Sequence, residues 1–487
     1  MMSWRGYHEF TKHSPESLRR TRHVLDWENM PDPFRHYEGV PLLDLPADPP
    51  APATPMLDVL QGASGSTLAA EGSVFLSQLL YHAAAISASK RIPSTGSKYA
   101  LRVNPSSGNL HPTEFHFISQ GLNQWPDGLY HYRPSSHMAE QRAIGDFSLN
   151  CPLRFILTSI VWREAWKYRD RAYRYCLLDI GHAWQALTLA ARAMGCQSFA
   201  TGHFPDDAIA QSLRLNDDEW PFLVVDLHPG SILLSANAAS NTAWFGGKAN
   251  ELSKESVDYP RIDEIHSATK LHEVTEFRSA STESDGIGEI QLPVPASSGR
   301  AFGDVARIRR SALDFCGGTE SMTLVQLSTV LAAANAPLVA DFASARFLQL
   351  YLYVHRVEGL QPGVYRFWPQ KNQLQAIRPG DQRVAAAGLS LGQDLAGNAC
   401  VAFSMVGDFE RATIAFGDRG YRYVFFEAGA LGHRLYLAAE ALGLGATGIG
   451  AFYDDEVHRY LGLTSAAGEV VYHFAIGHPV PDARLQA

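Results

Sequence analysis

The sequence predicts an α+β protein in which two tandem copies of one domain pack as an intramolecular dimer. The chain has 487 residues, which is too many for one hydrophobic core. Two short segments return at an offset of 248: DRAYRY at 170–175 as DRGYRY at 418–423, and FPDD at 204–207 as FYDD at 452–455. Helical and strand patterns mix without a regular βαβ rhythm, which favours α+β copies. Two fused copies imitate a symmetric homodimer, so we expect a pseudo-twofold axis between them.

Each copy is expected to contain the same elements in the same order. The expected pairs are helices at 73–85 and 322–334, strands at 113–119 and 348–355, strands at 154–161 and 398–406, long helices at 171–195 and 419–443, and apolar runs at 222–227 and 470–476. The long helices carry an apolar stripe with the same 4-3-4 spacing, which predicts one buried helical face in each copy. The stripe consists of Ala183, Leu187, Ala190 and Met194 in the first copy and of Leu431, Leu435, Ala438 and Leu442 in the second.

Two segments are expected to connect these units. Residues 45–55 contain five prolines and should run extended, because proline interrupts helices. Residues 236–300 are polar, with SASTESDGIGE followed by LPVPASSG, and this composition predicts loop or linker. The predicted organisation is an N-terminal extension (1–55), a first domain (56–235), a linker (236–300) and a second domain (301–487).

Charge and cysteine usage exclude several classes of protein. The net charge is −9, which disfavours binding to nucleic acid or to an anionic membrane. No apolar run reaches the ~20 residues of a membrane-spanning helix, and the start of the chain lacks the apolar core of a signal peptide. The five cysteines are widely spaced without a CxxC pair, so neither a disulfide framework nor a structural zinc site is expected. We expect a reduced, cytoplasmic protein without a metal.

Two polar motifs are candidates for ligand binding. Arg309-Arg310-Ser311 precedes a helical pattern, and two guanidiniums with a hydroxyl at a helix start suit a phosphate. Pro105-Ser106-Ser107-Gly108-Asn109 forms a tight turn before a strand, where small polar side chains let the backbone approach a flat ligand. Their counterparts in the other copy are Asp58-Val59-Leu60 and ADFAS at 340–344, which keep neither motif.

Two further segments carry possible chemistry. The glycine-rich segment 443–450, GLGATGIG, follows a helix instead of a strand, so it is not a dinucleotide-binding fingerprint. Its glycines can let backbone N–H groups face a ligand, or they can simply end the helix. Lys167-Tyr168 can act as a general acid or base if the pair lies next to a ligand, or it can be a surface pair. The second copy has Ala415-Phe416 at this position.

Together these segments resemble the FMN-dependent nitroreductase superfamily over most of residues 56–487. Arg309-Arg310-Ser311 with Phe315 resembles its phosphate motif, and PSSGNLHP at 105–112 resembles its second flavin motif in the form used by SagB-type dehydrogenases. The segment 445–463 and the closing AIGHP at 475–479 are similar to the C-terminal half of the superfamily. Lys167-Tyr168 resembles the Lys-Tyr pair of azoline dehydrogenases, which oxidise thiazoline or oxazoline rings in modified peptides.

The resemblance implies one FMN site made by both copies. The second copy would supply Arg309, Arg310, Ser311, Gly448 and Gly450, and the first copy would supply Pro105, Ser106, Ser107 and Asn109. The other composite site would be degraded in both halves. A third arginine that is often present in the phosphate motif is Leu313 here, and Arg484 could compensate.

The expected activity follows from the cofactor that the resemblance implies. Flavin N5 accepts and passes on a hydride, while the protein supplies position and charge. We expect a SagB-like dehydrogenase with Lys167 and Tyr168 as the catalytic pair, acting on a small molecule or an azoline-type modified peptide. Two alternatives stay open: a nitro- or quinone-reductase that uses NAD(P)H, and a flavin-free scaffold in a biosynthetic complex.

Overall fold

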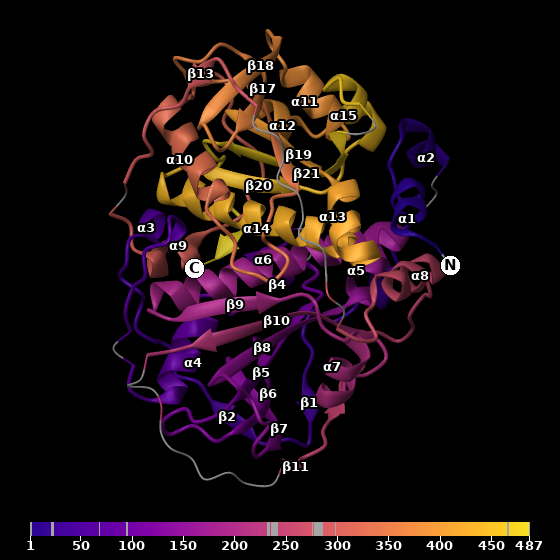
Figure 1. Ribbon diagram of the computed structural model, residues 1–487, viewed down its shortest axis with the longest axis vertical. Coiled ribbons are helices and arrows are strands. Elements are labelled where there is room, and N and C mark those ends of the chain that lie inside the picture. Colours follow the sequence, from indigo (N-terminus) through magenta and orange to yellow (C-terminus); the bar gives the residue numbers. More distant parts are fainter. Residues whose placement is uncertain are drawn as a thin grey trace.

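A computed structural model describes residues 2–20, 24–67, 69–93, 96–230, 234, 242–274, 276, 286–297, 299–464 and 467–486. It contains two α+β units, one in the lower half of Figure 1 and one in the upper half, and each is built around its own antiparallel sheet. The predicted tandem α+β organisation is therefore confirmed.

The two sheets have the same strand order. In sheet order, the first copy's strands are β11 (Ala243–Trp244), β7 (Met138–Ile144), β6 (Gly128–Arg133), β5 (Thr113–Ser119), β8 (Leu153–Ile160), β10 (Glu219–His228) and β9 (Gln197–Thr201), and β2 (Leu42–Asp44) also pairs with β7. The second copy's are β13 (Ile290–Gln291), β18 (Gln373–Pro379), β17 (Gly363–Trp368), β15 (Leu348–Val354), β19 (Val401–Gly407), β21 (Glu469–Gly477) and β20 (Gly445–Ile449). The predicted strands correspond to β5, β8, β10 and their equivalents, whereas β6, β7, β9 and their equivalents were not predicted.

Helices also occur in equivalent pairs. They are α1 (Trp4–Phe10) and α8 (Pro260–Thr269), α3 (Met56–Leu60) and α9 (Phe302–Ile308), α4 (Gly72–Tyr81) and α10 (Leu324–Asn335), α5 (Val161–Tyr168) and α13 (Phe409–Phe416), α6 (Ala172–Ala193) and α14 (Gly420–Ala441), and α7 (Asp206–Leu213) and α15 (Asp454–Tyr460). The remaining helices are α2 (Pro15–Arg20), α11 (Arg383–Leu389) and α12 (Asp394–Asn398). The predicted helix at 73–85 ends earlier, at Tyr81.

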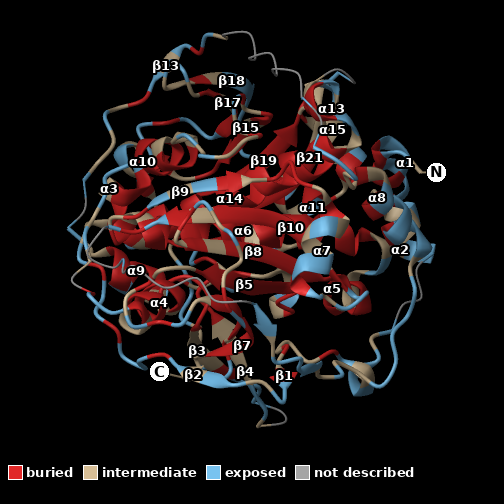
Figure 2. Ribbon diagram, turned by 60° about the horizontal axis from the view of Figure 1, so that its bottom comes forward, coloured by how far each residue is buried: buried red, intermediate tan, exposed pale blue. Residues whose placement is uncertain are grey.

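The long helices α6 and α14 lie between the two sheets and form the centre of the molecule (Figures 1 and 2). Every residue of α6 except Arg192, and every residue of α14 except Glu440, is buried. The apolar stripe predicted one buried face, but both helices are buried all round because each is covered by its own sheet and by the other helix. Their polar residues are therefore buried as well, and they build the interface and the site described below.

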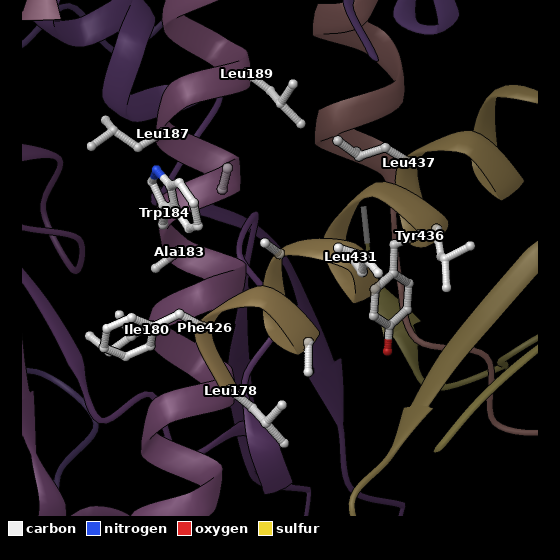
Figure 3. Close-up of a cluster of buried hydrophobic side chains, with 14 of the residues drawn as sticks. Leu178, Ile180, Ala183, Trp184, Leu187, Leu189, Phe426, Leu431, Tyr436 and Leu437 are labelled. Carbon is white, nitrogen blue, oxygen red and sulfur yellow. The ribbon is translucent and has the colours of Figure 1, made fainter. Parts of the chain in front are cut away.

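The two helices cross with their backbones in contact at two equivalent glycines. A Cβ on Gly181 would lie 2.3 Å from the carbonyl oxygen of Phe426, and a Cβ on Gly429 would lie 2.1 Å from that of Leu178. The two glycines are related by the 248-residue offset, so the pseudo-twofold axis passes close to this crossing. Leu178 and Ile180 from α6 and Phe426 from α14 fill the space beside it (Figure 3).

Two reciprocal clusters of buried charge join the copies. Arg171 and Arg174 of the first copy pair with Asp454 of the second at 3.0 and 2.9 Å. Arg419 and Arg422 of the second copy pair with Asp206 of the first, both at 2.6 Å. These residues are the repeated DRxYR and FxDD segments of the sequence, so the repeat encodes a self-complementary interface.

The repeat also includes α1 and α8, which lie outside the two ranges predicted from the sequence. Both helices end in a His-x-x-Thr-Lys segment, His8 to Lys12 and His266 to Lys270. Thr11 and Thr269 each accept hydrogen bonds from the nearby arginine pair. The expectation that 236–300 is only loop or linker is therefore wrong at 260–269, where a helix begins at Pro260 and buries Ile262 and Ile265. The first seven residues of the SASTESDGIGE segment, 279–285, lie outside the described residues.

Smaller sheets complete the fold. The strands β3 (Ile86–Arg91) and β4 (Lys98–Arg102) form an antiparallel pair, and β22 (Leu485–Gln486) adds to the edge of β3. Single pairs also form between β1 (Tyr37–Glu38) and β12 (Lys248–Ala249), and between β14 (Met322–Thr323) and β16 (Val357–Glu358). Within the described ranges, no helix is long and apolar enough to span a bilayer, and no cluster of three or more His, Cys, Asp or Glu side chains is arranged to hold a metal.

The buried clusters predict a specific loss of stability. Asp206→Asn should lower the free energy of unfolding by about 3–5 kcal/mol, because Arg419 and Arg422 would stay buried without their charge partner. Burial raises the pKa of Asp206, but the two arginines outweigh it and lower the pKa. This stabilisation should therefore persist at neutral pH and be lost only as the pH falls below ~4.

Urea unfolding measures the effect, and Asp207→Asn is the matched control. The carboxylate of Asp207 is half-exposed and pairs with Lys270 at 2.6 Å, so its loss should change stability by less than ~1 kcal/mol. Equal losses for the two variants would contradict the role assigned to the buried clusters.

Candidate functional site

A cavity of about 360 Å³ lies between the two copies. This size is within the range of small-molecule sites, roughly 300–1,000 Å³. The first copy lines it with Lys90, Tyr99, Leu101, Arg102, Asn104 to Asn109, His111, Tyr168, Tyr175, Asp179 and His182, and the second copy with Arg309 to Ser311, Gln393, Tyr436, Thr447 to Ala451 and Tyr472. The structure thus brings together the motif residues that the sequence assigned to two different copies, with Lys167 and Arg484 outside the lining.

One end of the cavity carries two arginines that have no carboxylate partner among the described residues. Arg309 is buried and donates to the carbonyl oxygens of Val103 and Arg102 at 3.1 and 3.3 Å, which leaves Nη1 without a hydrogen-bond partner among the described residues. Arg310 donates to three backbone carbonyls, including that of Ser87 at 2.8 Å. Burial and the neighbouring arginines lower the pKa of Arg310 to about 10. An anionic group at this end would relieve the repulsion between the arginines and would accept a hydrogen bond from Nη1 of Arg309.

The position of this arginine motif differs from the expectation. Arg309 follows α9 as its C-terminal cap instead of starting a helix, so the motif itself supplies no helix N-terminus and any anion bound to it would be held by its side chains. The motif then runs beside β20, where Ser311 pairs with Ala446 and its hydroxyl lies 2.9 Å from that of Tyr436. The helix starts, Met56 and Phe302, give an offset of 246, so the first-copy counterpart is Ala63-Ser64-Gly65 instead of 58–60. That segment also lacks a cation.

Lys90 lines the cavity, whereas Arg484, which the sequence suggested as a further phosphate ligand, does not. The guanidinium of Arg484 forms two bonds with Asp482, at 2.9 and 3.1 Å, and does not line the cavity. Lys90 is buried, lines the cavity and contacts the same carboxylate at 2.9 Å. Asp482 therefore holds a lysine of the first copy beside the arginines of the second.

The turn at 105–109 is held in an uncommon backbone conformation. Gly108 and Asn109 have φ of 59° and 60°, in the left-handed region, and such residues are concentrated at functional sites. The N–H and hydroxyl of Ser107 donate to Asp179 at 3.1 and 3.0 Å, and the hydroxyl of Ser106 accepts the N–H of His111 at 2.8 Å. The turn is thereby fixed to the centre of α6.

The glycines of 448–450 leave room for tyrosine side chains. A Cβ on Gly448 would lie 1.9 Å from the hydroxyl of Tyr472, and a Cβ on Gly450 would lie 2.4 Å from the ring of Tyr175. Gly448 belongs to β20, and its N–H donates to Tyr436 at 2.7 Å, so this N–H already has a partner within the chain. Gly450 follows the end of the strand, and its carbonyl accepts the hydroxyl of Tyr175 at 3.0 Å.

Lys167 and Tyr168 lie beside the turn. A Cβ on Gly108 would lie 2.7 Å from the Tyr168 hydroxyl and 3.1 Å from the Lys167 Nζ. Burial, followed by the charge of Glu164, raises the pKa of Tyr168 well above its usual value, so this phenol stays protonated and can donate a proton or hydrogen bond at neutral pH. The structure therefore places the pair next to the cavity and not on a distant surface.

Comparison with known proteins identifies the family. The nitroreductase family pattern matches residues 76–227 and 318–478, which is well over half of the chain and one match per copy. The chain belongs to the nitroreductase family. The nitroreductase-like protein MJ1384 of Methanocaldococcus jannaschii is 33% identical over 180 residues, covering 36% of this chain and 89% of that protein.

Two further relatives extend the comparison. A solved nitroreductase-like structure from Anabaena variabilis covers 99% of this chain and 100% of its own, with a TM-score of 0.76 and 26% identity. The microcin B17-processing protein McbC of Escherichia coli is 29% identical over 151 residues, covering 27% of this chain and 55% of McbC. The full length of the tandem nitroreductase arrangement is thus shared with the Anabaena structure.

The second composite site of this nitroreductase is filled by side chains. Phe342, from the ADFAS segment, is buried and stacks on Tyr423 with ring centroids 4.4 Å apart, and it also contacts Trp184. The equivalent of Trp184 is Gly432, where a Cβ would meet the rings of His182 and Tyr472. In the first composite site, here called the open site, the rings of His182 and Tyr472 occupy the space beside Gly432. In the second, here called the closed site, the indole of Trp184 fills the equivalent space.

Several residues of the open site were not found from the sequence. Lys90, Asp179, His182, Tyr436 and Tyr472 line the cavity. Burial and Arg309 lower the pKa of His182 to about 3, so this imidazole is neutral, and its Nε2 lies 3.1 Å from the Tyr472 hydroxyl. The sequence did contain a usable signal, because Asp179 and His182 stand among the mostly apolar residues of the long helix.

Proposed function

We propose that the protein is an FMN-dependent oxidoreductase that transfers a hydride between a substrate and flavin N5. The observation that carries the proposal is the composite cavity. Its cationic end suits the phosphate of a nucleotide-like redox ligand, and the Ser-Ser-x-Asn turn and the Lys-Tyr pair lie where they could contact the rest of such a ligand. Arg309, Arg310 and Lys90 would hold the phosphate, and the unpartnered Nη1 of Arg309 fits an anionic oxygen. The bound flavin would supply the site for hydride transfer.

Contacts in the closed site support a role for the glycine turn as a hydrogen-bond donor to the flavin. There, the N–H groups of Gly202 and His203 donate to the carboxylate of Asp341 at 2.9 and 3.0 Å. Their equivalents at the 248-residue offset are Gly450 and Ala451, which line the cavity. These two N–H groups are therefore suited to donate to an acceptor on the flavin ring, a role that Gly448 cannot take while its N–H donates to Tyr436.

We favour a SagB-like dehydrogenase with a small-molecule or modified-peptide substrate. Similarity to the microcin B17-processing protein McbC and to the trifolitoxin-processing protein TfxB of Rhizobium leguminosarum supports this choice. The matches span 55% of McbC and 42% of TfxB, so the substrate rests on this limited similarity and on the Lys167-Tyr168 pair. A reductase that uses NAD(P)H is the second candidate, favoured by the 33% identity to MJ1384.

The test of the proposal is cofactor content. The purified protein should be yellow and should release about one FMN per chain on heating, because Trp184 and Phe342 fill the second site. Absorbance and chromatography of the released flavin measure the ratio. A colourless protein that cannot be reconstituted with FMN would favour the flavin-free scaffold, and two equivalent FMN per chain would contradict the closed second site.

Arg310→Ala should weaken FMN but not riboflavin. Loss of charge-assisted hydrogen bonds to the phosphate removes roughly 1.5–3 kcal/mol, which is about one to two decades in affinity. Riboflavin has no phosphate and should be nearly indifferent. Fluorescence titration of the apoprotein measures both, and Arg484→Ala is the control, since its guanidinium pairs with Asp482 outside the cavity. A similar loss for the two flavins would rule out phosphate contact by Arg310.

Lys167→Ala and Tyr168→Phe should keep FMN bound while slowing substrate oxidation. Removal of a proton from carbon needs a positioned general base, and a positioned acid–base group is worth about 10²–10⁴ in rate. Reduction of the flavin by an artificial donor should be unchanged, and the flavin spectrum reports occupancy in the same sample. Normal substrate turnover in both variants would favour the NAD(P)H-dependent reductase over the dehydrogenase.

A further inference from the structure

The helix α5 carries a third functional group on the face that holds Lys167 and Tyr168. Glu164, Lys167 and Tyr168 are spaced i, i+3 and i+4, so they share one face of the helix. The equivalent helix α13 has the same length and carries Ala412, Ala415 and Phe416 at the 248-residue offset. Because the second copy folds without it, a carboxyl group at position 164 is not needed for the fold.

The burial of Glu164 favours the protonated, neutral form of its carboxyl group. Its side chain is fully buried, and neither carboxyl oxygen has a hydrogen-bond partner among the described residues. An ionised carboxylate in this environment would cost several kcal/mol, so the neutral acid is favoured. Burial and the charge of Asp179 raise the pKa of Glu164 well above its usual value, against a smaller opposing effect of Lys167.

Asp179 is the second carboxyl group, and it reaches the cavity directly. It lines the cavity and holds the Ser107 turn through two hydrogen bonds. Burial raises its pKa to about 7, while the bonds from Ser106 and Ser107 oppose the shift. The titratable groups that interact with the two carboxyls are Lys167 and Tyr168 on α5, Cys176 on α6 and Tyr472 on β21.

The equivalent of Asp179 in the closed site is in a different environment. Glu427 accepts the N–H of Phe347 at 3.0 Å, and Arg346 and Arg411 oppose the rise of its pKa on burial. In the described part of the chain, no arginine has this effect on Asp179 or Glu164. Burial and the electrostatic interaction with Asp179 outweigh the opposing effect of Lys167 on Glu164, and this disfavours ionisation of both carboxyl groups near neutral pH. Ala412 takes the place of Glu164 in the second copy, so the closed site has no equivalent of these two carboxyls.

We propose that Glu164 and Asp179 form a carboxyl pair that holds one proton beside the redox site and takes up a second as the bound flavin is reduced. The proposal rests on the proposed function. A hydride donor is oxidised and delivers two electrons and one proton to the ring, which leaves one added negative charge. The carboxylate of Asp179 then takes one proton from solvent and becomes a neutral acid, so the total charge of the site is unchanged. Asp179 acts on the ring through Ser107 and is a positioning residue.

Infrared difference spectroscopy of the FMN-loaded full chain tests the pair without a substrate. About one pH unit above the Asp179 pKa, photoreduction should produce one new carbonyl stretch of a protonated carboxyl group. Asp179→Asn, which can still accept from Ser107, should lose this signal, and Glu427→Gln should keep it. For a two-electron couple, the additional proton steepens the pH dependence of the flavin potential by about 30 mV per pH unit, and Asp179→Asn should remove this increment.

Glu164 is tested in the oxidised protein at the same pH. One protonated-carboxyl signal should disappear in Glu164→Gln and remain in Asp179→Asn. The pair is overturned if reduction of the wild type gives no carboxyl signal, if the signal survives in Asp179→Asn, or if Glu164→Gln loses none. Failure to bind FMN would contradict the proposed function instead, and the Glu164 signal of the flavin-free chain would then decide whether the pair exists.

Discussion

The contact between α6 and α14 at Gly181 and Gly429 determines how the rest of the molecule is arranged. Backbone contact at this crossing leaves no space for a Cβ, so the two sheets are held at one separation. The arginine–aspartate clusters on both sides of the crossing then fix the rotation of one copy against the other. The cavity lies in this interface, and its walls keep their shape only while the two copies keep this relation.

Fusion of the copies has allowed the two equivalent sites to diverge. In a dimer of identical chains, a substitution changes both sites together. Here Gly432 and Trp184 occupy equivalent positions with opposite consequences: the glycine leaves space for His182 and Tyr472, and the indole fills the space at the other site. The closed site now supplies packing, with Phe342 between Tyr423 and Trp184.

The sequence predicted the parts of this structure that depend on local patterns. Repeated DRxYR and FxDD segments identified the pseudo-dimer, and the Ser-Ser-x-Asn and Arg-Arg-Ser motifs identified two walls of the cavity. Contacts distant in sequence were not predictable in the same way. Lys90 reaches the cavity from the strand pair of β3 and β4, and Asp179 lies on a helix whose composition is typical of a buried core. The helix α8 was missed because its apolar positions are few, and the resemblance between His8 to Lys12 and His266 to Lys270 is short enough to escape notice without the structure.

The covalent joining of the two halves has a consequence for behaviour on dilution. A site shared between separate subunits is lost when the subunits dissociate, so its occupancy depends on protein concentration through mass action. In this chain the partner half is always tethered, and its effective concentration does not change as the protein becomes scarce. The shared cavity can therefore persist at copy numbers at which an unlinked pair of the same surfaces would separate.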